Sequence, residues 1–182
     1  MITPPVPRRF SAGSNRGNFP PMEELFLRKR ALSLWQEGQR LQLEGDVRSA
    51  IELYNRSIEV FPTAEAHTFR GWAFSAQNRL DDAIAECKRA IAIDPGFGNP
   101  YNDIGSYLLA KGNTDDAVTW LERAKRAPRY EPRHFPYINL GRLFASRGQV
   151  AKAIQEFEGA LGLCPGEPSV KAALLTLRQR IN

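Results

Sequence analysis

The sequence predicts an all-α protein in which antiparallel helix pairs stack into a solenoid. Three observations predict this fold: small residues that recur every 33 to 36 positions, large residues at helical spacing around them, and a turn residue in the middle of each repeat. The chain has 182 residues, of which 42% are hydrophobic and 25% are charged, and these values are typical of a globular protein. One domain is therefore expected.

Four columns of residues run in phase along the chain. Glycines stand at Gly38, Gly71, Gly105 and Gly141, at intervals of 33, 34 and 36 residues. An alanine follows each glycine by 12 positions, and a second small residue follows each alanine by 7. These two columns are Ala50, Ala83, Ala117, Ala153 and Ser57, Ala90, Ala124, Ala160. Proline ends three of the units, and Arg129 stands in the proline column of the third.

Each unit is predicted to be a pair of antiparallel helices. Large residues before and after each glycine, such as Leu34 and Leu41, share one helix face, and the glycine lets another backbone approach that face. The turn residues that follow are Gly45, Asn78, Gly112 and Gly148. The second helix buries the alanine column and ends at the proline. Because one pair cannot bury its own apolar face, neighbouring pairs must stack.

The expected repeats span about 31–63, 64–97, 98–133 and 134–167, within a repeat domain of residues 21–167. The first helix is extended N-terminally to about residue 21, because no proline or glycine interrupts it before Gly38. Residues 168–182 carry an apolar stripe that is typical of a capping helix. Residues 1–20, rich in Pro, Gly and Arg, are predicted to be a disordered basic tail.

Residues 31–166, about three quarters of the chain, resemble four tetratricopeptide repeats in their period, glycine column, small-residue columns and terminal proline. The resemblance implies a right-handed superhelical solenoid. Glu37 and Arg70 depart from the pattern, because they precede their glycines where many such repeats carry leucine. Since they hold equivalent sites on adjacent first helices, one hypothesis is an ion pair between them. The alternative is that both charged ends are solvated.

The resemblance also implies a function, because the first helices of such repeats line a concave groove that binds peptide segments of partner proteins. The implied groove set has aromatic anchors in its first half and amides and an arginine in its second. Its members are Trp35, Gln39, Thr68, Phe69, Trp72, Asn102, Ser106, Ile138, Asn139 and Arg142. One branch of the family binds the C-terminal carboxylate of heat-shock chaperones through groove lysines. Trp35 and Gln39 stand at the corresponding sites, so chaperone-tail binding is not expected.

Charge is distributed unevenly along the chain, whose net charge is +5. Residues 1–30 carry +4, residues 31–122 carry −6, residues 123–147 carry +6 and residues 148–182 carry +1. The second basic zone contains the longest repeat interval, and its connector is expected to present Arg126, Arg129, Tyr130 and Arg133 to solvent. An acidic protein segment is the natural ligand for such a surface. A solvated face and head-to-tail pairing with the acidic part of another copy are the alternatives.

The sequence contains no recognisable catalytic set. His67, His134, Cys87 and Cys164 show neither metal-ligand spacing nor a nucleophile–base arrangement, and no phosphate-binding glycine loop is present. We therefore expect no enzyme activity, no metal and no cofactor. Nucleic acid is not expected as a partner, because few exposed aromatic residues lie among the arginines. A cytoplasmic location is expected, because no transmembrane segment or signal peptide is evident.

The expected function is that of a non-enzymatic adaptor or scaffold that binds a protein or peptide in the concave groove, with the basic connector as a second contact. A fixed superhelix presents its anchors already in place, so most of the ordering cost of binding falls on the ligand. The alternative is a self-assembling scaffold, a homo-oligomer whose copies pair through charge-complementary contacts.

Overall fold

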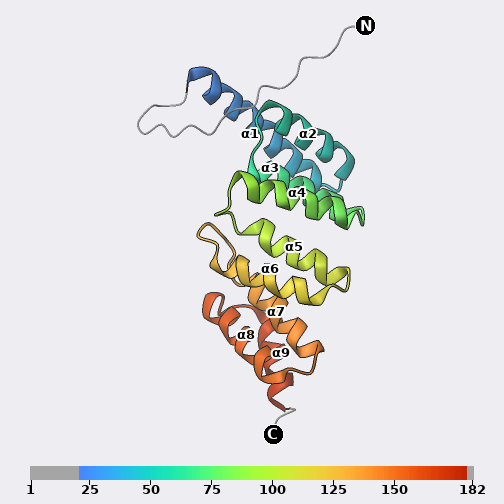
Figure 1. Cartoon of the computed structure of the whole chain (residues 1–182), viewed down its shortest axis with the longest axis vertical. Helices are drawn as coiled ribbons and strands as arrows, with labels where there is room; N and C mark the ends of the chain where they lie inside the picture. Colours follow the sequence, from blue (N-terminus) through green and yellow to red (C-terminus); the bar gives the residue numbers. More distant parts are fainter. Residues whose placement is uncertain (1–20, 180–182) are drawn as a thin grey trace.

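The computed structural model describes residues 21–179, and within that range the chain forms nine helices and no strand (Figure 1). The helices are α1 (Met22–Leu43), α2 (Val47–Val60), α3 (Ala64–Ala76), α4 (Leu80–Ile93), α5 (Asn99–Ala110), α6 (Thr114–Arg126), α7 (Phe135–Ser146), α8 (Val150–Leu163) and α9 (Pro168–Gln179). Consecutive helices pack as pairs, α1 with α2 through α7 with α8, and α9 packs against α8. The predicted all-α solenoid is confirmed. The predicted tail, residues 1–20, lies outside the described residues.

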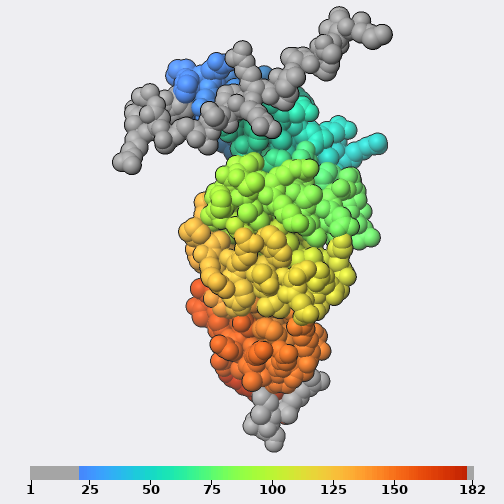
Figure 2. All heavy atoms as spheres, viewed as in Figure 1, coloured from blue at the N-terminus to red at the C-terminus, as the bar shows by residue number. Residues whose placement is uncertain are grey.

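The first helices of the pairs form the inner layer of the solenoid. Helix α1 contacts α3, α3 contacts α5, and α5 contacts α7, whereas each second helix packs chiefly against its own partner and the first helix of the next pair. Neighbouring first helices are therefore closer together than neighbouring second helices, and the stack is concave on their side. Figure 2 shows the pairs as successive blocks along the long axis of the molecule.

Local sequence signals begin the helices and turn the chain between them. The side chains of Asp46 and Thr63 each accept a hydrogen bond of 3.1 Å from the backbone N–H three residues later, which caps α2 and α3. The turn inside each pair contains one residue with positive φ: Gly45 (91°), Asn78 (59°), Gly112 (79°) or Gly148 (71°). The predicted turn column therefore adopts the left-handed conformation that lets the second helix run back along the first.

The repeated alanines form the tightest part of the core. Ala50, Ala83, Ala117 and Ala153 are all 0% exposed. The glycine column was predicted to let another backbone approach. In the structure, side chains of the paired helix approach most of these glycines instead. A β-carbon on Gly105 would lie 2.6 Å from Cγ of Leu121 on the paired helix, and Gly38 and Gly141 face aromatic rings in the same way. Only at Gly71 is the nearest atom a backbone oxygen, at 3.2 Å.

The predicted ion pair between Glu37 and Arg70 is wrong. Glu37 pairs with Arg40 of its own helix at 2.6 Å, while Arg70 donates to the carboxylate of Glu86 through Nε (2.9 Å) and Nη2 (2.7 Å). Glu86 is 2% exposed and also lies 2.7 Å from Nδ1 of His67. A buried carboxylate needs hydrogen-bond donors to compensate its charge. Glu86 lies on the helix paired with α3 and therefore close to Arg70, so Arg70 pairs with Glu86 and not with Glu37.

The buried carboxylate of Glu86 is held in its ionised form. Burial by itself raises the pKa of Glu86, but the hydrogen bonds from His67 and Arg70 outweigh it and hold the pKa below the ordinary value of 4.5. Arg70 also donates to Oδ1 of Asn55 at 2.7 Å, so this cluster ties α3 both to α4 and to α2 of the preceding pair.

Candidate functional site

A cavity of about 470 Å³ opens on the inner layer of the first two pairs. We call it the aromatic cavity; its lining residues are Trp35, Gln39, Glu65, Phe69, Phe97, Asn99, Pro128, Arg129, Tyr130 and Glu131. The rings of Trp35 and Phe69 meet edge to face with centroids 5.2 Å apart, and Phe69 lies 4.6 Å from the ring of Trp72. Helices α1 and α3 thus supply an aromatic wall, whose ring pairs also stabilise the packing of the two helices.

The opposite wall is the connector between α6 and α7, residues 127–134, which folds onto the loop between α4 and α5. The backbone N–H of Gly98 donates to the carbonyl of Arg129 at 2.8 Å, and the N–H of Arg129 donates to the carbonyl of Gly96 at 3.0 Å. These bonds draw Tyr130 inward until it is 4% exposed. The prediction that Tyr130 faces solvent is therefore wrong, because two backbone hydrogen bonds hold the connector against the preceding repeat.

The charge of Arg129 is used within the protein. Its guanidinium donates to Asp94 (2.5 and 3.0 Å) and to Glu65 (2.9 Å), and it lies over the ring of Phe97 at 4.2 Å from the centroid. Arg129 therefore bridges the loop before α5 to α3. Arg133 donates to the carbonyl of Pro128 at 2.8 Å within the connector. Arg129 is exposed, as expected, with 51% of its side chain accessible, but its contacts to the carboxylates of Asp94 and Glu65 already compensate its charge.

The aromatic cavity consequently has an acidic bias. Glu65 and Glu131 line it, and its one arginine, Arg129, shares its charge between Glu65 and Asp94. These groups attract a basic side chain and repel an acidic one, while a neutral side chain is tolerated. The indole N–H of Trp35 is also buried without an acceptor among the described residues. A buried donor without an acceptor costs about 1–3 kcal/mol, so a carbonyl brought to this point would be favoured.

The second half of the predicted groove is a row of polar side chains that bind one another. Nδ2 of Asn139 donates to Oδ1 of Asn102 and to Oγ of Ser106, both at 3.1 Å. Asn102 is 9% exposed, so its amide serves the contact between α5 and α7. Arg142 is exposed on the same helix as Asn139.

Besides Asn102, two more residues of the predicted groove are buried. Thr68 is 0% exposed and donates to the carbonyl of Ala64 at 2.8 Å, and Ile138 is 4% exposed in the core formed with α8 and α9. Placing them in the groove is therefore wrong, because their positions on α3 and α7 turn towards neighbouring helices. Trp35, Gln39 and Phe69 lie together at the aromatic cavity. Trp72 is half-buried beside them.

A buried carboxyl group lies behind Trp72. Oδ2 of Asp103 accepts a hydrogen bond of 2.5 Å from Nε1 of Trp72, and Asp103 is 8% exposed. No cation pairs with Asp103 among residues 21–179. Burial raises the pKa of Asp103 from 3.8 to about 7, and the hydrogen bonds from Trp72 and Asn102 oppose the rise only in part.

Replacing Asp103 by asparagine is expected to change stability in a pH-dependent way. A raised carboxyl pKa stabilises the fold below pH 3.8, and this contribution is lost as the pH rises through about 7. An asparagine side chain does not ionise, so the stability of D103N relative to the parent should increase by up to about 4 kcal/mol between pH 4 and pH 8. Urea unfolding of both proteins at the two pH values measures it. A difference that stays constant with pH would contradict the assignment.

Five residues of the aromatic cavity were absent from the predicted set: Glu65, Phe97, Asn99, Pro128 and Glu131. The one available signal was the third repeat, where the interval is 36 residues and Arg129 stands in the proline column. That signal indicates an unusual connector. It does not indicate onto which face the connector folds, because this depends on hydrogen bonds to a loop about 30 residues earlier.

Within residues 21–179 no helix is long and apolar enough to cross a lipid bilayer. The same residues contain no group of three or more His, Cys, Asp or Glu side chains placed to hold a metal ion. Burial raises the pKa of the Cys87 thiol, which keeps it protonated.

Comparison with known protein families and sequences finds repeats of one kind along the chain. Models described as tetratricopeptide repeat match residues 36–96, 74–134 and 136–167. Small glutamine-rich tetratricopeptide repeat-containing protein 2 of Mycosarcoma maydis is 36% identical over 90 residues, which are 49% of this chain and 26% of that protein. The protein of the same name from Saccharomyces cerevisiae is 28% identical over 99 residues, 54% of this chain and 29% of that protein. The chain thus spans less than a third of the length of these two relatives.

Solved structures show the same architecture. PilF of Pseudomonas aeruginosa superposes with a TM-score of 0.80 at 23% identity, covering 85% of this chain and 70% of that one. TTC0263, a thermophilic TPR protein of Thermus thermophilus, has a TM-score of 0.67 at 22% identity, and the match covers 84% of this chain and 83% of that one. The second TPR of Spaghetti (RPAP3) bound to an HSP90 peptide has a TM-score of 0.55 at 22% identity, and the match covers 58% of this chain and 99% of that one. At these identities the likeness shows the fold alone.

Proposed function

Because the chain belongs to the tetratricopeptide repeat family, we propose that it is a protein–protein interaction adaptor that binds an extended peptide segment in the aromatic cavity. Proteins with these repeats mediate protein–protein interactions. The observation that carries the proposal is the cavity itself, about 470 Å³ lined by Trp35, Phe69 and Phe97. This volume lies in the range of about 300–1,000 Å³ that is typical of ligand sites, and aromatic side chains dominate the energetics of interfaces.

The lining residues define the ligand chemistry that we propose. An aromatic or aliphatic side chain would pack against Phe69 and Phe97, while the amides of Gln39 and Asn99 would bond its backbone. Glu65 and Glu131 favour a neutral or basic segment over an acidic one. The Spaghetti complex supports peptide binding as a use of this fold. The ligand that we propose differs from a chaperone tail, because Trp35 and Gln39 replace the lysines that would hold a C-terminal carboxylate.

Panning a phage-displayed library of random twelve-residue peptides against the full chain tests the proposal. We expect the enriched peptides to carry an aromatic or aliphatic residue without flanking acids. Their affinity should fall at least about 30-fold in Phe69→Ala, the effect of roughly 2 kcal/mol that marks an interface hot spot. Because Phe69 also packs against Tyr54, Asn99→Ala is a second variant that removes a cavity amide and leaves the aromatic wall intact.

Phe135→Ala is the matched control, because Phe135 is 45% exposed on α7 and lies outside the cavity. Circular dichroism checks that each variant is folded. Peptides that bind Phe69→Ala and Asn99→Ala as tightly as the parent would overturn the proposal. A chain that forms oligomers at about 50 mM salt and dissociates at about 500 mM would instead favour the self-assembling scaffold, since salt screens pairing between surface charges.

A further inference from the structure

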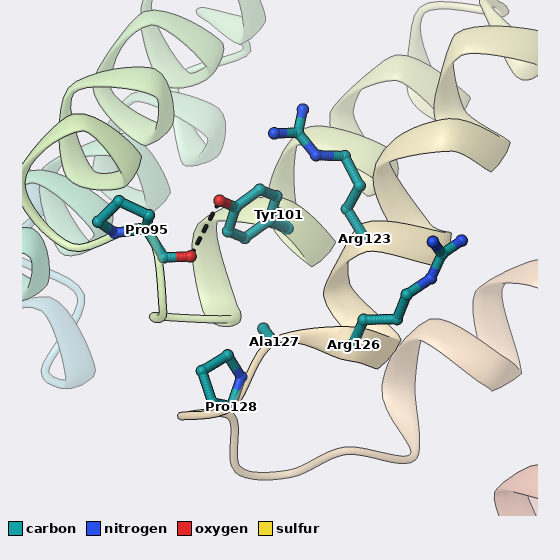
Figure 3. A pocket seen from close by; sticks show the side chains of 6 residues that line it. All are labelled: Pro95, Tyr101, Arg123, Arg126, Ala127 and Pro128. Atoms are coloured by element: carbon teal, nitrogen blue, oxygen red, sulfur yellow. Dashed lines mark hydrogen bonds between the residues drawn. The ribbon is translucent and has the colours of Figure 1, made fainter.

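A second cavity lies on the other side of Pro128, which lines both cavities. It is a hollow of about 190 Å³ between the loop before α5, the start of α5 and the end of α6 (Figure 3). We call it the arginine hollow; its lining residues are Pro95, Tyr101, Arg123, Arg126, Ala127 and Pro128. Figure 3 shows the two arginines leaving the end of α6 on one side and the two prolines across from them. No acidic side chain lines this hollow.

The guanidinium of Arg123 is oriented by aromatic rings rather than by a carboxylate. Its central carbon lies 4.6 Å from the ring centroid of Trp120 and 5.0 Å from that of Tyr101. The hydroxyl of Tyr101 donates to the carbonyl of Pro95 at 3.0 Å, which holds that ring in place. Arg123 makes no salt bridge within residues 21–179. Stacking occupies a face of the guanidinium plane and leaves its N–H edge available for an anion.

Arg126 is the second available cation. Its side chain is 77% exposed, and its one salt-bridge contact within the described chain is to Glu122 at 4.0 Å. Lys125 is closer to the same carboxylate, at 2.9 Å. Other cations of this basic zone are more fully paired: Arg129 with Asp94 and Glu65, and Lys125 with Glu156 as well. Two guanidiniums without a close carboxylate partner in the described chain therefore lie about one helix turn apart at this hollow, whereas Arg129 of the connector is paired.

We propose that the arginine hollow is a second docking site, specific for an acidic peptide segment with two carboxylates two residues apart. Side chains at positions i and i+2 of an extended strand project from the same face, roughly 7 Å apart. Arginines one turn apart on a helix have β-carbons about 5–6 Å apart, which suits this spacing. An apolar side chain on the same face of the peptide would fill the space beside Pro95 and Pro128.

The hollow does not suit a nucleic acid. Single strands bind by stacking bases on open aromatic faces. Tyr101 is 6% exposed, and Arg123 covers the rings of both Tyr101 and Trp120. The two cavities also differ in charge, because carboxylates line the aromatic cavity and guanidiniums line the hollow. One extended partner that crosses Pro128 would therefore place a neutral or basic part in the first and an acidic part in the second.

Titration of the full chain, labelled with nitrogen-15, with a capped peptide Gly-Leu-Thr-Glu-Thr-Glu-Gly tests the proposal. The control peptide replaces both glutamates by glutamine. We expect shifts at the side-chain N–H groups of Arg123, Arg126 and Trp120, and affinity about 10-fold or more above that of the control peptide at low salt, falling as salt is added. The double variant Arg123→Gln, Arg126→Gln should abolish the preference for glutamate.

The single variant Arg126→Gln keeps Arg123 stacked on its rings and changes only an exposed side chain, so it should fold as the parent does. We expect it to lose part of the affinity for the glutamate peptide, and this loss would then come from the missing charge and not from unfolding. The matched control is Arg48→Gln, Arg56→Gln, two exposed arginines of α2 with the same change of net charge, and it should bind as the parent does. Equal affinity for both peptides, equal loss in the α2 control, or shifts confined to the indole of Trp35 would each overturn the proposal. Charge-dependent binding of a single-stranded oligonucleotide in preference to the glutamate peptide would also overturn it. If the parent protein forms a dimer and Arg126→Gln dissociates it, the hollow is a contact between copies of this chain, and the proposal is overturned.

Discussion

Replacing Glu86 by alanine is expected to lower the free energy of unfolding by about 3–5 kcal/mol, the cost of removing one partner from a buried ion pair. Glu86 is 2% exposed and accepts hydrogen bonds from Arg70 at 2.7 and 2.9 Å. Among the described residues, its loss leaves the Arg70 guanidinium, which is 15% exposed, with Asn55 as its one side-chain acceptor, and removes the hydrogen-bond partner of His67 Nδ1. Urea unfolding followed by circular dichroism measures the change.

Glu37→Ala is the matched control, because Glu37 pairs with Arg40 on the exposed face of α1. We expect no measurable change there, since exposed pairs of this kind contribute little. If both substitutions have the same effect, Glu86 does not have the structural role described.

The same carboxylate predicts an acid-dependent loss of stability. A carboxyl group whose pKa is lowered on folding stabilises the protein above its ordinary value of 4.5, and this contribution disappears as the pH falls through the lowered pKa. The difference between the parent and Glu86→Ala should therefore shrink below pH 4.5. It should not vanish, because protonation removes the charge of Glu86 but leaves its packing in place. Asp103 has the opposite pH dependence, because its pKa is raised.

Replacing Gly98 by alanine is expected to displace the connector and to destabilise the protein by about 2–4 kcal/mol, combining overpacking with the loss of a buried tyrosine. A β-carbon at Gly98 would lie 2.5 Å from Cγ of Tyr130 and closer still to its Cβ. Cβ of Tyr130 is fixed to the backbone, so it cannot move away unless the connector backbone moves with it. The displacement would break the hydrogen bond from Gly98 to the carbonyl of Arg129. Limited trypsin digestion should then cut Gly98→Ala after Arg129 faster than it cuts the parent.

Gly162→Ala makes the same chemical change where a β-carbon meets no atom within 4 Å. Gly162 lies in α8, so alanine there should stabilise the protein by about 0.5–1 kcal/mol through helix propensity alone. Unchanged trypsin sensitivity in Gly98→Ala would show that Tyr130 does not hold the connector in place.

The repeated pattern in the sequence was sufficient to predict the helical solenoid. The spacing of Gly38, Ala50 and Ser57 recurs in every unit, and each such signal acts within a stretch of about 20 residues. Helix periodicity, turns with positive φ and helix-ending prolines are local properties, so they can be read from the chain without knowing its tertiary contacts. The aromatic character of the first half of the groove, at Trp35 and Phe69, followed from the same alignment of repeats.

Only the tertiary structure decided which charges are available to a ligand. Arg129 bonds Glu65, which is 64 residues away, and Tyr130 is buried against a loop of the preceding repeat. Arg70 takes Glu86 as its partner because that carboxylate is both nearer and buried. Ion pairs and loop packing depend on which groups, distant in the sequence, compete for the same partner. An arginine pairs with the carboxylate that is nearer to it and that loses more free energy if it is buried without a partner. The sequence pattern by itself therefore determined the solenoid, whereas the packing decided which arginines are paired with carboxylates, as Arg129 is, and which are held by aromatic rings, as Arg123 is.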